Sequence, residues 1–171
     1  MESIGELLVV DERRALEFFV TGLQDVSDPK VDRQELLYNA SVLAHYAQVS
    51  VRAELEMPAP EDLSAIFDQF VVNNTALTGD SHLMETAGAQ CLLLTGFFED
   101  QMRGRHNIRW YAEIGAGFFT RAATFEESRA KARLLTMIAR HFEPWRQRQA
   151  RLSRELRDQP YLLSPTPRSL M

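Results

Sequence analysis

The sequence predicts an all-α fold, a single-domain bundle of about six or seven helices. Apolar residues recur at spacings of three and four along most of the chain, and no stretch alternates with the period of two expected of a strand. The composition, 45% hydrophobic and 25% charged, is that of a globular domain, and 171 residues suit one domain. We expect the domain to span residues 1–157 and an irregular, proline-containing tail to span 158–171.

The first half of the chain divides at its prolines. Asp11 is expected to cap a first helix, and Asp28-Pro29 separates it from a longer helix over about 32–54. Two prolines within Met57–Pro60 mark a linker, and a short helix is expected to begin at Pro60.

The segment from 81 to 102 is apolar on all sides, unlike its neighbours. A helix of this kind is surrounded by other helices, so we place it at the centre of the bundle. A tight basic turn over 103–107 follows, in which Gly104 takes a left-handed conformation.

Three further helices are expected after that turn. The first spans about 108–123, where tight packing would explain Gly115 and Gly117 in the helix interior. The second begins at Thr124 or Phe125. Pro144 predicts either a helix break or a proline in the first turn of the third helix, which extends to about Arg157.

The single cysteine and the pattern of the first residues indicate the cellular compartment in which we expect the protein. Cys91 is the single cysteine, which excludes an intramolecular disulfide and a Cys-based zinc finger, and its apolar helix predicts a buried, structural thiol. The first residues lack the pattern of a secretory signal, and the most apolar stretch, about 12 residues long, is shorter than the roughly 20 that cross a membrane. We therefore expect a cytoplasmic protein without membrane association. Its preference for arginine, 17 of 19 basic residues, is typical of a GC-rich bacterial genome.

Charge is distributed unevenly along the chain, whose net charge is -5. Residues 1–100 hold 18 acids and 5 bases, whereas residues 101–171 hold 6 acids and 14 bases. The densest basic run lies on the last helix, which makes it a candidate surface for another subunit or a protein partner. The residues proposed for this surface are Arg148, Arg151, Leu152, Arg154 and Leu156. The other interpretations are a phosphate-binding stripe with weak nucleic-acid affinity and a face neutralised within the protein.

A second polar cluster surrounds the turn before the helix at 108. It is a candidate ligand-binding site, and its residues are Arg103, Arg105, His106, Arg109 and Tyr111. An apolar pocket behind this basic rim would be lined by Phe97, Phe98, Tyr111, Phe118 and Phe119. The alternative is a junction between two helices, held by the pairs Glu99–Arg103 and Arg109–Glu113.

No motif in the sequence indicates catalysis, a metal or a cofactor. The four histidines are scattered, and no nucleophile elbow, phosphate-binding loop or paired metal-ligand motif occurs.

The segment from about Gly88 to Ala123 resembles a family of all-helical bacterial proteins without an established activity. The resemblance rests on an apolar helix ending in Thr95-Gly96-Phe97-Phe98, a linker with Arg103 and Arg105, and a helix opening with Trp110-Tyr111. It covers about 35 residues and implies a helical hairpin and a bacterial source, with no residue roles to carry over.

These observations together predict a non-enzymatic protein that acts by association, as a homodimer or with a protein partner. The alternative is a small-molecule-binding helical domain, and the second alternative is weak nucleic-acid binding.

Overall fold

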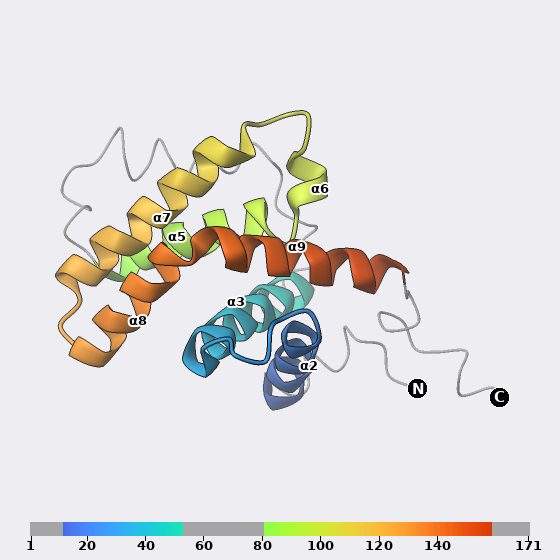
Figure 1. Ribbon diagram of the computed structural model, residues 1–171, viewed down its shortest axis with the longest axis horizontal. Helices are drawn as coiled ribbons and strands as arrows, with labels where there is room; N and C mark the ends of the chain where they lie inside the picture. Colours follow the sequence, from blue (N-terminus) through green and yellow to red (C-terminus); the bar gives the residue numbers. More distant parts are fainter. Residues whose placement is uncertain (1–11, 53–80, 159–171) are drawn as a thin grey trace. The chain divides into compact units, whose positions relative to one another are not determined.

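The structure is a computed structural model that describes residues 12–52 and 81–158. Over these residues it contains seven α-helices and no strand, which confirms the all-α prediction (Figure 1). The linker expected at 57–60, the helix expected from Pro60 and the tail beyond Asp158 lie outside the described residues.

The chain forms two compact units. One comprises residues 1–57 and 151–171, and the other comprises residues 58–150. Helix α9 (Phe142–Asp158) contributes to both, since the division follows Ala150. The single domain expected over 1–157 stays a prediction.

The first unit is built on α2 (Glu12–Asp25) and α3 (Arg33–Arg52), which pack against each other. The Asp32 side chain accepts a hydrogen bond from the Glu35 backbone N–H at 2.9 Å, which satisfies one free donor at the start of α3. A Cβ atom on Gly22 would lie 2.8 Å from Leu152 Cδ1, so the absence of a side chain at Gly22 leaves space for Leu152 of α9.

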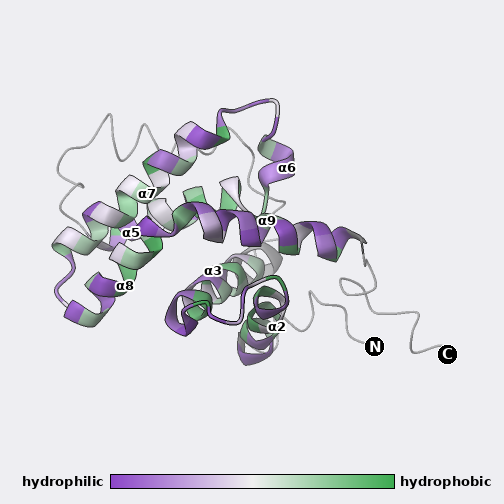
Figure 2. Ribbon diagram, in the orientation of Figure 1, coloured by the Kyte–Doolittle hydropathy of each residue, from purple (hydrophilic) through white to green (hydrophobic). Residues whose placement is uncertain are grey.

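The second unit is layered around α7 (Ile108–Phe125), which packs against α5 (Ser81–Thr95) and α8 (Arg129–Arg140). Helices α5 and α7 are the more hydrophobic helices of this unit, whereas α8 and α9 are more hydrophilic (Figure 2). The buried side chains of this unit include Met84, Leu92, Tyr111, Phe118, Phe119, Leu135, Ile138 and Phe142.

The helix expected over 81–102 is two helices, which corrects the prediction. Helix α5 ends at Thr95, and α6 (Glu99–Met102) follows after a break at Gly96–Phe98. A Cβ atom on Gly96 would lie 3.1 Å from the Arg146 carbonyl oxygen, so the backbone of α9 approaches closely there. Apolar periodicity does not detect this break because apolar residues continue through it, with Phe98 buried and Phe97 half-buried.

The boundary between α7 and α8 also differs from the prediction. The helix expected to begin at Thr124 or Phe125 begins at Arg129, because Ser128 Oγ accepts a hydrogen bond from the Lys131 backbone N–H at 3.3 Å. Pro144 lies in the first turn of α9, where a proline is tolerated, as predicted.

The tight packing predicted at both glycines of α7 is present at one of them only. A Cβ atom on Gly115 would lie 2.6 Å from Cys91 Cβ and 2.7 Å from Phe142 Cζ, which confirms the tight contact there. For Gly117 the prediction is wrong, since no atom of the described chain lies within 4 Å of an added Cβ. Gly104 takes φ +85°, the left-handed conformation predicted for the basic turn.

Cys91 is buried, as predicted, and burial raises the pKa of its thiol to about 12. Because the thiolate is the reactive form, we expect the native protein to react with a disulfide reagent far more slowly than the urea-unfolded chain. Absorbance of the released thiol at neutral pH measures both rates. Equal rates in the two states would contradict the buried thiol.

No helix in the described ranges is long and apolar enough to cross a membrane.

Candidate binding groove

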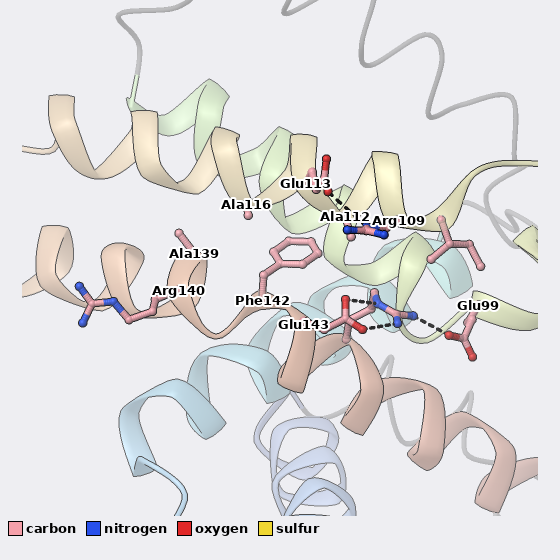
Figure 3. A pocket seen from close by; sticks show the side chains of 11 residues that line it. Glu99, Arg109, Ala112, Glu113, Ala116, Ala139, Arg140, Phe142 and Glu143 are labelled. Carbon is pink, nitrogen blue, oxygen red and sulfur yellow. Dashed lines mark hydrogen bonds and ion pairs between the residues drawn. The ribbon is translucent and has the colours of Figure 1, made fainter.

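The second unit contains an open groove between α7 and the junction of α8 with α9. Its volume is about 640 Å³, and all of its lining residues lie between Glu99 and Arg146. Figure 3 shows Phe142 projecting into the space between the two helical walls, with Arg140 beyond one end and Glu99 at the other. The complete lining is Glu99, Ile108, Arg109, Ala112, Glu113, Ala116, Ala139, Arg140, Phe142, Glu143 and Arg146.

The apolar part of the groove consists mainly of small side chains. Ala112 and Ala116 lie one turn apart on α7, and Ala139 faces them from α8 (Figure 3). Position 142 is the first residue of α9, so the turn at His141 directs the Phe142 ring between the walls. Short side chains on both walls leave room that a larger residue would fill.

One end of the groove is closed by a charged network around Arg146. Its side chain, 11% exposed, donates hydrogen bonds to the carboxylates of Glu99 and Glu143 and to the Thr95 carbonyl oxygen at 3.0 Å. Thr95 is the last residue of α5, so Arg146 also satisfies a carbonyl group left free by the helix end. Glu99, whose side chain is 10% exposed, additionally accepts a hydrogen bond from Arg103 at 2.9 Å.

Hydrogen bonds in this network shift the pKa values of Glu143 and Arg146. Hydrogen bonds from Arg146 lower the pKa of Glu143, and hydrogen bonds to Glu143 and Glu99 raise the pKa of Arg146. Both effects favour the charged forms of Glu143 and Arg146.

The ligand site predicted from the turn is only partly on the groove. Arg109 lines the groove and forms an ion pair with Glu113 at 3.5 Å. Arg105 is exposed on the turn, and the Tyr111 ring is buried with its edge against the His106 ring. The pairs Glu99–Arg103 and Arg109–Glu113, which define the junction alternative, are both present.

Of the aromatic residues predicted to line a pocket, all but Phe97 are buried. Phe98, Phe118 and Phe119 are buried, and the Phe119 ring contacts the Phe142 ring at a centroid distance of 6.1 Å. Phe142 reaches the groove, whereas these three side chains do not line it.

The arginine surface predicted on α9 is divided between the two units. In the second unit, the Arg148 guanidinium lies 4.5 Å from the centre of the buried Trp145 ring. In the first unit, Arg151 forms an ion pair with Glu155 at 3.6 Å, and Arg154 is exposed. Leu152 and Leu156 are buried within the protein, so their side chains are not exposed to a partner.

Sequence reasoning overlooked the basic surface of α8. This helix contains four basic residues and no acidic residue. Arg129, Arg133 and Arg140 are exposed and have no ion-pair partner in the described part of the chain, whereas Lys131 bonds Glu85 at 2.9 Å. In the sequence this surface is indicated by a stretch from 128 to 142 with four basic residues and no acidic residue, less dense in arginine than the run on α9.

Comparison of the chain with protein-family models, with curated proteins and with solved structures gives no match. Within the described residues, no three His, Cys, Asp or Glu side chains lie close enough to hold a metal ion.

Proposed function

We propose that the protein acts by association and that the groove between α7 and α8 receives a helical segment of a protein partner. The observation that carries this proposal is the open, alanine-lined groove with Phe142 in its floor. Helices approach to about 8–10 Å according to the size of the side chains between them, so alanine walls admit a third helix closely. An amphipathic helix would bury its apolar face against the partly exposed Ile108, Ala116 and Ala139, and keep its polar flanks beside the charged rims.

The shape of the groove favours a helix over a compact ligand. Its volume falls within the roughly 300–1,000 Å³ of small-molecule sites, which keeps a small ligand as the alternative. Such sites bury most of their ligand, however, and this groove is open along one side. A partner helix needs only one face covered.

Filling the groove is expected to abolish peptide binding without unfolding the protein. An Ala116→Trp variant would place an indole between the walls, whereas Ala130→Trp puts the same side chain on an exposed position of α8 outside the groove lining. The probe is a yeast-displayed library of short amphipathic helices with varied flanks. We expect clones enriched on wild type to bind Ala130→Trp equally and to lose about tenfold or more in affinity on Ala116→Trp, since tenfold corresponds to about 1.4 kcal/mol.

Two results of this experiment would contradict the proposal. One is a library from which nothing is enriched on the wild-type protein, which would favour the small-molecule alternative. The other is a set of enriched clones that bind Ala116→Trp as well as wild type, since their site would lie elsewhere. Circular dichroism of each variant establishes that it is folded.

A further inference from the structure

The exposed arginines of α8 form a continuous stripe. Arg129, Arg133 and Arg140 are separated by four and seven residues, so with 3.6 residues per turn they share one face of the helix. The stripe is about 16 Å long, taking 1.5 Å of rise for each of its eleven residue steps. Thr136 is the fourth exposed residue on this face and is uncharged.

No acid of the described chain neutralises this stripe. The carboxylates that flank α8 in sequence are Glu126, Glu127 and Glu143. Glu126 accepts a hydrogen bond from the Ser128 backbone at 3.1 Å, Glu127 is exposed before the first turn, and Glu143 is bonded to Arg146. The three arginines therefore present their full charge to solvent.

The stripe begins at one end of the groove. Arg140 belongs to both, and the neighbouring Ala139 lines the groove wall on the same helix (Figure 3). Arg133 and Arg129 lie farther along α8 and do not line the groove. A helix that is seated in the groove and continues along α8 would therefore lay one polar flank along the stripe.

We infer that the α8 arginine stripe selects a partner helix whose flank is acidic, an inference that rests on the proposed function of the groove. The occupant is an amphipathic helix of another protein, with an apolar face for the alanine walls and Asp or Glu residues spaced along one side. Arginine suits this role because its planar guanidinium bonds a carboxylate through two parallel N–H groups.

The observations favour an acidic helix over a nucleic acid. Three arginines are few for a phosphate-binding surface, and the chain as a whole carries a net charge of -5. Stacking platforms for single strands use aromatic side chains beside the basic ones, and α8 has none. The adjoining apolar groove would serve no purpose for a phosphate backbone, whereas it completes the site for an amphipathic helix.

The test compares two displayed helix libraries that share their apolar positions and differ in one flank, which is Glu in one and Lys in the other. The key variant is Arg133→Glu/Arg140→Glu. Its matched control, Arg105→Glu/Arg121→Glu, makes the same change in net charge at two exposed arginines that do not line the groove. We expect wild type and control to select the Glu library, with affinity falling as salt is added. The key variant should reverse the preference, by about tenfold in relative affinity.

The outcomes separate this inference from the proposed function. If both libraries are selected equally and the Arg133→Glu/Arg140→Glu variant changes nothing, the role inferred for the arginine stripe is wrong. The proposed binding of a helix in the groove is then still supported. Selection of neither library would overturn both. Binding of a fluorescein-labelled DNA strand that the key variant alone abolishes, with no peptide selected, would overturn the inference in favour of a nucleic acid. If the wild-type protein sediments as a dimer and the key variant as a monomer, the inferred partner is wrong, and the occupant is a second copy of this chain.

Discussion

An Arg146→Ala variant is expected to lose about 3 kcal/mol of unfolding free energy, because removing one partner of a buried ion pair costs roughly 3–5 kcal/mol. The Glu99 carboxylate, 10% exposed, would lose its hydrogen bond from Arg146, and the Thr95 carbonyl would lose its donor at the end of α5. The lower end of the range applies because Arg103 still bonds the other oxygen of Glu99. Urea denaturation monitored by circular dichroism measures the loss.

Two further variants test whether the loss comes from leaving the buried Glu99 carboxylate without Arg146. Arg103→Ala removes an exposed arginine from the same carboxylate and is expected to cost less than about 1 kcal/mol. Glu99→Gln/Arg146→Met removes both charges of the buried pair with side chains of similar length and should recover part of the loss. A buried ion pair replaced as a whole is often nearly neutral, but the Thr95 carbonyl still lacks its donor. An Arg146→Ala variant as stable as Arg103→Ala would show that the network contributes little.

The helices of the second unit could be predicted closely because each carries its own local signals. Helix α7 begins where expected, after Asn107, whose side chain accepts a hydrogen bond from the Trp110 backbone N–H at 3.1 Å. The break at Gly96 could not be predicted, because its cause is the approach of the Arg146 backbone, fifty residues away in the sequence. Local periodicity reports which side of a helix is buried and says nothing about which backbone comes near it.

The groove could not be predicted from the sequence either, because it also depends on contacts between residues far apart in the chain. Its walls pair Ala116 with Ala139, and its charged end pairs Glu99 with Arg146, contacts that exist only after the helices pack. Sequence analysis found Arg109 and the two ion pairs of the junction because these depend on spacing within or next to one helix. It also expected an exposed role for Leu152 and Leu156, which the structure buries.

The arginines show a further limit. The run on α9 is denser than that on α8, but charge density does not tell which arginines are already paired. Arg151 and Arg146 have carboxylate partners, whereas Arg129 and Arg133 have none in the described ranges. Only the structure shows which of these arginines are exposed and unpaired in the described ranges, and both of them lie on α8.

The two glycines in the middle of α7 are expected to respond oppositely to alanine. At Gly115 the new methyl group would meet Cys91 Cβ at 2.6 Å and the Phe142 ring at 2.7 Å, and relieving such overlap costs about 1–3 kcal/mol. At Gly117 the methyl group enters open space in the described structure, so alanine should add about 0.5–1 kcal/mol through its better helix propensity. Thermal and urea unfolding of both variants measure the difference.

This pair also probes the groove, because only Gly115 touches a groove residue. Displacement of the Phe142 ring by Gly115→Ala is expected to weaken the helices selected on wild type, while Gly117→Ala should bind them unchanged. The Gly117→Ala variant serves as the matched control, since it makes the same substitution in the same helix two residues away. A Gly115→Ala protein as stable as wild type would contradict the close packing of α5, α7 and α9 around that position. Destabilisation by Gly117→Ala would instead indicate that its open face is covered in the native protein.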